Sequence, residues 1–276
     1  MQNDRKPRAV RHVSDFHSAK TDRGNGSGAE ELRGLRLPPF YDIHHHLVWG
    51  IDADGPKTFE ESCEMARAAA RNGVIDIVTT PHVMPGIRPF DREAYLNRLS
   101  ALQQWCVEQG LELRLHPGGE IFYTPMTLQY LSEGRAPTMN GGSHVLVEFD
   151  TGLDLAEIRR ACEALVNHGY TPIIAHCERY RAFVKHPRAA MKLRDEYALA
   201  LQVNCGALLH PHDFWTKRFI SVLLAAEAVD CISSDAHNTG TRPVLMEQAY
   251  IKLSKRVSEE YRYRLFRGLS LGEDAQ

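Results

Sequence analysis

Short apolar runs alternate with longer amphipathic stretches along the chain from about residue 40. The apolar runs are rich in Val, Ile and Leu, and their short length is typical of buried strands, whereas the amphipathic stretches predict helices. Strands are predicted at Phe40–His44, Ile75–Thr80, Leu111–His116, His144–Phe149, Thr171–Ala175, Leu201–Asn204 and Asp230–Ser233. Helices are predicted from the N-cap Thr58 to Asn72-Gly73 and at Asp91–Glu108, Asp154–His168, Pro187–Tyr197, Trp215–Ala228 and Arg242–Gly268.

Repeated strand–helix alternation favours a parallel sheet with helices packed on its faces. Seven such units predict a single-domain α/β fold that closes into a barrel, with the active-site loops at the carboxyl ends of the strands. The barrel domain is expected to span residues 37–276. Residues 1–36 begin with several basic residues, and glycines interrupt any periodicity, so we expect a disordered N-terminal tail there.

Composition and charge exclude several classes of protein. A net charge of −2 provides no global field toward nucleic acid, and no apolar run reaches the length of a membrane span. The six cysteines form no CxxC pair and no signal peptide is recognised, so we expect reduced thiols in a cytoplasmic protein. None of these cysteines is followed by five residues and then arginine, which excludes a thiol-dependent tyrosine phosphatase.

Histidines and carboxylates stand where the predicted strands end. His44 and His46 alternate along the first strand and its exit, so both can point into the barrel mouth while His45 faces the other way. Asp52 and Asp54 follow in the next loop. The later strand ends carry His82, Glu120, Glu148, His176, Asp235 and His237. Because the carboxyl ends of parallel strands meet at one edge, we expect these side chains to converge.

Such a convergence predicts bound metals. Carboxylates and imidazoles gathered without cations would repel one another or stay unsatisfied, and divalent metal ions resolve that problem. Because no cysteine thiolate is expected among the ligands, the set suits Mn²⁺, Fe²⁺ or Zn²⁺.

The motifs resemble the polymerase-and-histidinol-phosphatase (PHP) superfamily and, more narrowly, the bacterial capsule-type tyrosine phosphatases of the CpsB/YwqE family. The resemblance runs from about residue 40 to about residue 250 and implies a distorted (β/α)7 barrel of the PHP type. It is carried by Asp42-Ile-His-His-His46, Asp52-Ala-Asp-Gly-Pro-Lys57, Thr80-Pro-His82, Gly119-Glu120, Val147-Glu148, Ala175-His-Cys-Glu-Arg179, Asn204-Cys-Gly206 and Ser234-Asp-Ala-His-Asn238 with Arg242.

The resemblance implies a site with three divalent metals, Mn²⁺ being preferred to Fe²⁺ or Zn²⁺. One metal would be held by His44, His46, Glu120 and Asp235. A second would share Glu120 and add Glu148 and His176, and a third would take Asp54, His82 and His237. Where the family reads Asp-Asp-Gly, this chain has Asp52-Ala-Asp54-Gly55, which is one residue longer. Asp54 keeps its place before the glycine and is preferred as the ligand, while Asp52 stays an alternative.

The implied activity is a metal-dependent phosphoesterase that hydrolyses phosphotyrosine in proteins, without a phospho-enzyme, in capsule or exopolysaccharide regulation. A metal lowers the pKa of bound water from 15.7 towards about 7, so a metal-bound hydroxide is the expected nucleophile. Arg179, Arg242 and His237 are the candidate catalytic residues, the arginines matching the family's phosphate-binding pair. A general acid, if one exists, would be a protonated histidine at the metal edge or a metal-bound water. The implied partner is the tyrosine-rich tail of a bacterial tyrosine kinase.

Other functions remain open at this stage. A PHP phosphatase acting on a small metabolite such as histidinol phosphate would share nearly the same ligands. An amidohydrolase-type enzyme would not require paired phosphate-binding arginines, so Arg179 and Arg242 argue against it. A degenerate PHP module that only binds a partner should have lost several ligands, whereas this set looks complete apart from the first loop. The sequence does not indicate an oligomeric state.

Overall fold

A computed structural model describes residues 37–269, so the tail predicted at residues 1–36 lies outside the described residues. The strands are β1 (Phe40–His45), β2 (Val74–Thr79), β3 (His82–Val83), β4 (Arg114–Pro117), β5 (Glu120–Phe122), β6 (His144–Glu148), β7 (Thr171–Ile174), β8 (Ala200–Asn204) and β9 (Cys231–Ser233). The α-helices are α1 (Phe59–Arg71), α2 (Arg92–Glu108), α3 (Thr127–Ser132), α4 (Leu155–Asn167), α5 (Arg181–Lys185), α6 (Pro187–Tyr197), α7 (Cys205–Leu209), α8 (Phe214–Ala225), α9 (Met246–Leu253) and α10 (Glu259–Leu265). Two short 3₁₀ turns, η1 (Met139–Gly141) and η2 (Cys177–Arg179), complete the described elements.

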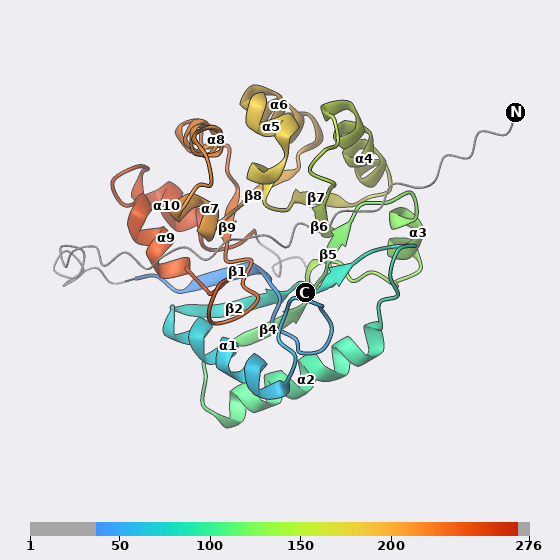
Figure 1. Ribbon diagram of the computed structural model, residues 1–276, viewed down its shortest axis with the longest axis vertical. Helices are drawn as coiled ribbons and strands as arrows, with labels where there is room; N and C mark the ends of the chain where they lie inside the picture. Colours follow the sequence, from blue (N-terminus) through green and yellow to red (C-terminus); the bar gives the residue numbers. More distant parts are fainter. Residues whose placement is uncertain (1–36, 270–276) are drawn as a thin grey trace, which may run out of the picture. The chain divides into compact units, whose positions relative to one another are not determined.

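All the strand pairs are parallel and follow the order of a curled barrel. One sheet has the order β1-β2-β4, and the other has the order β3-β5-β6-β7-β8-β9. A parallel bridge between His45 and Ala236 joins the exit of β1 to the segment after β9. The helices form a ring outside the strands (Figure 1). The structure therefore confirms the predicted α/β barrel with a curled parallel sheet.

Two of the seven predicted strands, Ile75–Thr80 and Leu111–His116, are each followed by a second short strand that the sequence did not predict. Thr80 and Pro81 separate β2 from β3, and Gly118 and Gly119 separate β4 from β5. A Cβ atom on Gly118 would lie 2.6 Å from Val78 Cγ1, so the two strands can approach this closely only with glycine there. The sequence predicted that His82 and Glu120 stand where the preceding strands end. In the structure they instead begin the short strands β3 and β5.

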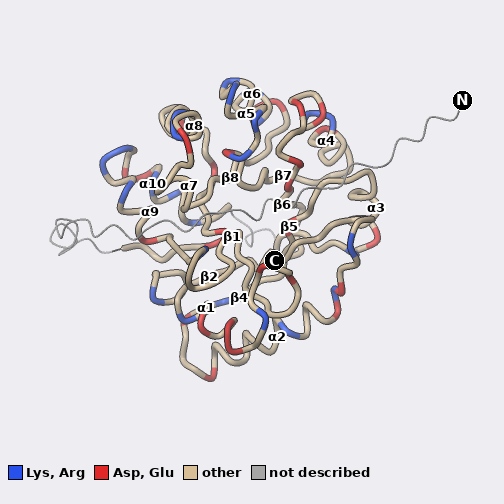
Figure 2. Tube along the Cα trace, in the orientation of Figure 1, with Lys and Arg blue, Asp and Glu red and all other residues tan. Residues whose placement is uncertain are grey.

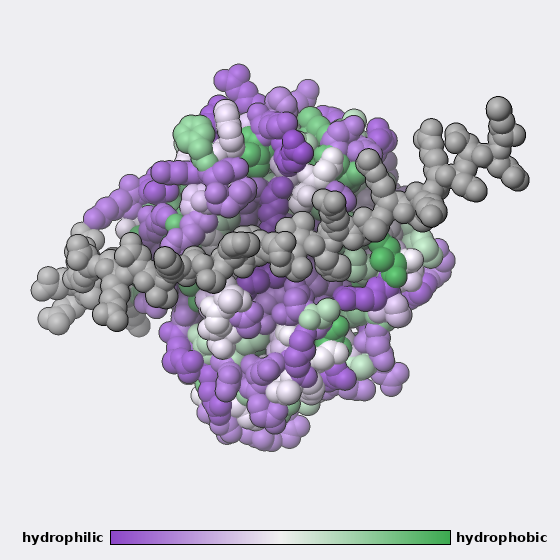
Figure 3. All heavy atoms as spheres, viewed as in Figure 1, coloured by the Kyte–Doolittle hydropathy of each residue, from purple (hydrophilic) through white to green (hydrophobic). Residues whose placement is uncertain are grey.

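The apolar core has two layers. The larger layer lies between the strands and the surrounding helices, and a smaller cluster includes Ile43, Val78, Leu146 and Ile173 from four different strands. Charged residues are concentrated on the outer helices and loops (Figure 2), and the surface in the same view is mostly hydrophilic (Figure 3). None of the helices between residues 37 and 269 has the length and apolarity to cross a membrane.

The C-terminal segment differs from its prediction. Instead of one helix over Arg242–Gly268, the chain forms α9 and α10 with a turn between them. Ser258 begins α10 by accepting a hydrogen bond from Tyr261 N, which is the local signal for a new helix start. Thr58 caps α1 as predicted, because its side chain accepts from Glu61 N.

A charged cluster joins β2 to β4 and links stability to pH. The largely buried Asp76 accepts hydrogen bonds from Arg114 Nε at 2.9 Å and His116 Nε2 at 2.8 Å. Burial by itself raises the pKa of Asp76, but His116 and Arg114 together hold that pKa below its usual range. Because the folded-state pKa is depressed, the stabilisation is present at neutral pH and is lost as the pH falls through that pKa.

We expect Asp76→Asn to lower the free energy of unfolding at pH 7 by about 1–3 kcal/mol, since the amide leaves its partners poorly satisfied. The difference between wild type and variant should shrink at pH 3, where the wild-type carboxyl becomes protonated. Urea unfolding at the two pH values measures this. An Asp195→Asn variant, on the exposed face of α6, serves as the control. A destabilisation that does not change with pH would contradict the linkage.

Candidate metal centre

The predicted histidines and carboxylates converge at the carboxyl ends of the strands. His44, His46, Glu120 and Asp235 form a buried group there, each with at most 3% of its surface exposed. Nε2 of His44 lies 3.4 Å from both Glu120 Oε2 and Asp235 Oδ1. Nε2 of His46 lies 3.3 Å from Glu120 Oε2, 3.5 Å from Asp235 Oδ1 and 3.3 Å from His44 Nε2. Donor atoms bound at about 2.1 Å to one tetrahedral ion lie about 3.4 Å from one another, so these separations fit a metal.

The orientations of the His44 and His46 rings also fit a metal ion between these four side chains. His46 Nδ1 lies 3.0 Å from Asp52 Oδ2, and His44 Nδ1 lies 3.1 Å from Gln202 Oε1. Both oxygens only accept, so each Nδ1 carries a proton, and each Nε2 of a neutral ring presents a lone pair to the centre. Lone pairs and carboxylate oxygens that face one another need a cation between them.

Glu120 links this group to a second one. Its Oε1 lies 2.7 Å from His176 Nε2, while Oε2 faces the first group. Glu148 Oε1 lies 3.6 Å from the same His176 nitrogen. Burial, and after it the negative charge of Glu120, raises the pKa of Glu148 to about 7. The single carboxylate of Glu120 is therefore placed between two sets of donors.

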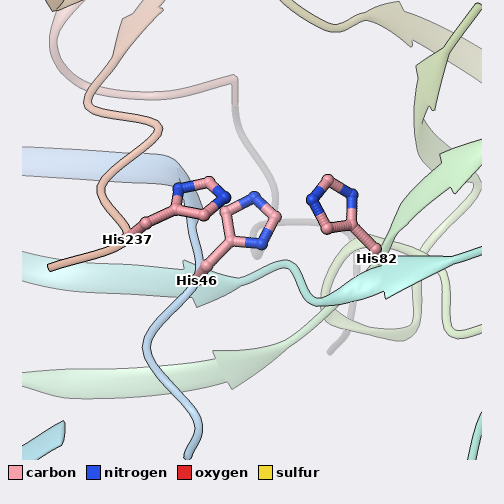
Figure 4. Close-up of side chains that lie close together, drawn as sticks. All are labelled: His46, His82 and His237. Atoms are coloured by element: carbon pink, nitrogen blue, oxygen red, sulfur yellow. The ribbon is translucent and has the colours of Figure 1, made fainter. Parts of the chain in front are cut away.

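A third group contains Asp54, His82 and His237. The rings of His82 and His237 lie on either side of His46, and the three come from different elements (Figure 4). His237 Nε2 lies 3.3 Å from Asp54 Oδ2 and has no hydrogen-bond partner, although it is buried. Its Nδ1 donates to the carbonyl of Asp235 at 3.0 Å, so Nε2 of the neutral ring carries no proton. This nitrogen and the Asp54 carboxylate are therefore two acceptors that face one another. His82 Nε2 is 3.8 Å from Asp54 Oδ1.

The structure separates the two aspartates of the first loop. Asp52 is buried behind the ligand candidates, where its Oδ1 accepts from His82 N at 2.8 Å and its Oδ2 meets His46 Nδ1. Asp54 instead faces the free nitrogen of His237. From these contacts we expect Asp54 to be the metal donor and Asp52 to orient His46.

The pKa shifts of the histidines show that the buried carboxylates favour positive charge at this site. Burial by itself lowers the pKa of His44, but Glu120 and Asp235 raise it above its ordinary value. Burial opposes protonation of His82 as well, yet Glu120 raises its pKa to about 10. Burial lowers the pKa of His237 to about 4. Divalent metals would replace the protons that the carboxylates otherwise hold on these rings.

Two arginines stand at the edge of the group. Arg179 donates to Asp235 Oδ2 at 2.8 Å and Arg242 donates to the same oxygen at 2.9 Å. Arg242 also donates to Asp54 Oδ2 at 3.2 Å. Their side chains remain 40% and 35% exposed, so both guanidinium groups can be reached by an anion from solvent.

The backbone around the site is unusual at two positions. His176 and Asp235 have positive φ angles of 31° and 51°, a region that L-residues rarely occupy. Each such conformation costs about 1–3 kcal/mol and is retained where the surrounding structure demands it. A shift of register on β1 also contributes, because the three steps from Asp42 to His45 lie opposite only two steps of β2, from Ile77 to Thr79. Asp42 and His45 consequently contact each other, away from the donor groups.

Gln202 supports the donor groups and was not predicted from the sequence. Its Oε1 accepts from His176 N at 2.6 Å as well as facing His44 Nδ1. Its Nε2 donates to Asn204 Oδ1, and Asn204 Nδ2 donates to Asp235 Oδ2 at 2.7 Å. A signal was available, because Leu201-Gln-Val-Asn204 places two polar residues in alternation on a fully buried strand.

We expect Asp52→Asn to weaken metal affinity or activity about 10–100-fold, which is typical of removing a group that orients a ligand histidine. The amide can still accept, but it presents an N–H to His46 or His82 in one of its orientations. Metal titration and phosphatase assays on folded variant protein would measure the effect. Ala53→Ser, in the exposed part of the same loop, is the control. Wild-type affinity and activity in Asp52→Asn would exclude the orienting role.

All six cysteines are free and buried, which agrees with the prediction of reduced thiols. Cys177 lies next to His176 in the chain, and burial raises its thiol pKa well above the usual value. A thiol held in its neutral form is a poor nucleophile.

The curled parallel barrel, with buried donor groups at its carboxyl edge, defines a metal-dependent α/β-barrel enzyme. The chain belongs to the CpsB/CapC family, because the family model described as capsular polysaccharide synthesis, CpsB/CapC, matches residues 40–270. The chain is 30% identical over 230 residues to the tyrosine-protein phosphatase CpsB of Streptococcus pneumoniae, covering 82% of this chain and 94% of the relative. It is 31% identical over 228 residues to the tyrosine-protein phosphatase YwqE of Bacillus subtilis, covering 81% and 87%.

Solved structures support the fold. The chain matches a structure from the study of YwqE from Bacillus subtilis and CpsB from Streptococcus pneumoniae, described as unique metal-dependent tyrosine phosphatases. This match has a TM-score of 0.72 and 30% identity, and covers 82% of this chain and 90% of the other. A β-aspartyl dipeptidase of Fervidobacterium islandicum AW-1 has a TM-score of 0.54 at 15% identity, covering 83% and 71%, and shares only the fold.

Proposed function

We propose that the protein is a metal-dependent tyrosine-protein phosphatase that acts on phosphoproteins in capsular polysaccharide synthesis. The observation that carries the proposal is the position of Arg179 and Arg242 on Asp235 Oδ2, directly beside the buried donor groups. Metal cations and guanidinium groups at one edge of the barrel suit a dianionic phosphoryl group. Relatives named tyrosine-protein phosphatases, at 30% and 31% identity, support the phosphotyrosine substrate.

The candidate ligands fall into the three groups described above, with Glu120 shared between two of them. His44, His46, Glu120 and Asp235 would hold one ion; Glu120, Glu148 and His176 a second; Asp54, His82 and His237 a third. Mixed nitrogen and oxygen donors without thiolate suit Mn²⁺, and also Fe²⁺ or Zn²⁺. When bound, such ions lower the pKa of coordinated water and neutralise charge on phosphoryl oxygens.

The chain's own residues bind and orient the substrate. Arg179 uses one NH2 group on Asp235, and Arg242 uses one on Asp235 and the other on Asp54. The N–H donors that these contacts leave over are available to phosphoryl oxygens. The two guanidinium groups would hold the phosphate in one orientation relative to the donor groups. The leaving phenolate has a conjugate-acid pKa of about 10 and departs more readily than an alkoxide, so a dedicated general acid is less necessary.

The physiological substrate we propose is a phosphotyrosine protein such as the tyrosine-rich tail of a bacterial tyrosine kinase. A small metabolite such as histidinol phosphate is the competing substrate, because its phosphate would meet the same donors and arginines.

The test begins with purified full-length protein, whose bound metals are quantified and then removed. Hydrolysis of p-nitrophenyl phosphate, a phosphotyrosine peptide and histidinol phosphate is measured without metal and with Mn²⁺ or Zn²⁺ added. Metal-restored hydrolysis of the peptide, with histidinol phosphate a poor substrate, is the expected result. Metal binding without phosphatase activity on either aryl substrate would overturn the proposal, and preferred hydrolysis of histidinol phosphate would favour the metabolite phosphatase.

A further inference from the structure

A surface rich in basic residues lies on the helices that follow β7 and β8. Asp195 and Glu196 line the same surface hollow as Arg188, but they pair with Arg194 and Arg159. Between Arg179 and Arg194 the chain contains no Asp or Glu. We call five of the exposed cations on α5, α6 and α8 the basic rim: Arg181, Lys185, Arg188, Lys217 and Arg218. Lys192 on α6 is exposed as well. Among the ion pairs formed within residues 37–269, none includes a member of the basic rim. Blue segments on these helices are visible in Figure 2.

Three members of the basic rim, Arg181, Lys217 and Arg218, lie in segments that begin near the carboxyl ends of the strands, the edge that carries the donor groups. Arg181 begins α5 two residues after Arg179, which contacts Asp235. Lys217 and Arg218 lie in the first turns of α8, which begins after the carboxyl end of β8. Helices α5, α6 and α8 contact one another, which brings the three segments that carry these cations together. Asp213, the one acidic residue between His210 and Ala225, is engaged as the N-cap of α8, accepting from Thr216 N at 2.7 Å.

An exposed aromatic pair adjoins these cations. Phe214 and Trp215 are 68% and 57% exposed, and their rings pack edge to face with centroids 5.4 Å apart. Apolar surface appears beside the hydrophilic surface of α5 and α6 in Figure 3. Large aromatic side chains left in water beside unpaired cations are typical of a protein-binding surface.

We propose that the basic rim and the Phe214–Trp215 pair bind an acidic, aromatic-containing segment of the phosphotyrosine protein, next to the phosphorylated residue. This proposal rests on the proposed function and specifies which phosphoproteins the enzyme prefers. Charge complementarity selects the occupant, because five unpaired cations attract carboxylates or further phosphates. The aromatic pair accommodates apolar or tyrosine side chains within that segment. Docking there raises the local concentration of phosphotyrosine at the donor groups without entering the chemical step.

The test compares two phosphotyrosine peptides that differ only in their flanks, one with Glu and Asp and one with Gln and Asn. We expect the metal-loaded wild type to hydrolyse the acidic peptide with kcat/KM about tenfold higher at low salt, and the preference to fall at high salt. The triple variant Lys185→Glu, Arg188→Glu, Lys217→Glu should lose or invert the preference. Free phosphotyrosine should be hydrolysed equally by both proteins.

A matched control reverses three exposed cations elsewhere, in the variant Arg71→Glu, Arg160→Glu, Arg256→Glu, which should keep the preference. A second measurement does not depend on catalysis: fluorescence anisotropy of the acidic peptide with unphosphorylated tyrosine. Its affinity should fall about tenfold in the rim variant and in Phe214→Ala/Trp215→Ala, but not in the control.

The outcomes separate this inference from the proposed function. Hydrolysis of free phosphotyrosine and of both peptides at equal efficiency would overturn the docking surface and leave the phosphatase intact. Absence of hydrolysis on every phosphotyrosine substrate would overturn the phosphatase and, with it, the substrate preference. Capture of the wild type by phosphatidylserine vesicles, lost in the rim variant while the peptide does not bind, would show a membrane contact and also overturn the proposal.

Discussion

Glu120→Gln is expected to remove nearly all phosphatase activity and to lower the amount of bound metal. Glu120 is 1% exposed and offers Oε2 to the His44–His46 group and Oε1 to His176. The amide keeps the shape but loses the negative charge and one acceptor, so both groups lose a donor at once. Removing a group that merely orients a ligand costs about 10–100-fold, and we expect a larger loss here.

Metal content by elemental analysis and kcat/KM for phosphotyrosine would measure this effect together. Glu133→Gln is the matched control, since that glutamate is exposed at the end of α3 and pairs only with nearby residues on the surface. A metal-free wild type should also unfold at a lower temperature than the loaded protein, because ligand binding at 1,000 times its Kd stabilises by about 4 kcal/mol. Full activity and metal content in Glu120→Gln would remove Glu120 from the metal centre.

Arg179→Ala is expected to lower kcat/KM for phosphotyrosine by about 10²–10³-fold, the loss typical of removing one donor to the developing charge. Arg179→Lys should recover only part of this activity, because an ammonium group lacks the planar fork that meets two phosphoryl oxygens. Metal content should change little, because Arg242 and Asn204 still hold Asp235 Oδ2.

Steady-state kinetics with metal analysis would separate phosphate binding from support of the donor groups. Arg160→Ala, on the exposed face of α4, is the control for a general effect of lost charge. If Arg179→Ala lost its metal along with its activity, the main role of Arg179 would be to position Asp235. If kcat/KM of Arg179→Lys equalled that of wild type, a single positive charge would be enough to bind the phosphate. The proposed bidentate role of Arg179 would then be wrong.

Local pattern in the sequence was enough to predict the fold class. The alternation of apolar runs and amphipathic stretches predicted parallel strands and helices, because burial on both faces of a strand and one face of a helix leaves its period in the sequence. Polar residues at the ends of those runs indicated which edge of the barrel carries chemistry. The absence of Cys-x5-Arg excluded thiol chemistry without any coordinates.

The boundaries of the elements needed the structure. The break between β4 and β5 depends on how near Gly118 comes to Val78 on another strand, and a local pattern does not encode that distance. The helix predicted over Arg242–Gly268 had the right periodicity, yet the chain turns before Ser258 and starts a second helix. The first break is set by a contact between distant segments, whereas the second follows from the local N-cap at Ser258, which periodicity alone does not reveal.

Tertiary structure alone decided how the polar residues divide their tasks. Asp52 and Asp54 are equivalent in type and close in sequence, but only the folded loop shows Asp52 behind His46 and Asp54 facing His237. Gln202 gained its role because β8 lies beside β7 and near the exit of β1. The sequence by itself determined which residues arrive at the barrel edge, since strand period and chain order are local properties. Only the tertiary structure decided which atoms face one another, because register, backbone bulges and positive φ angles are set by packing between distant segments.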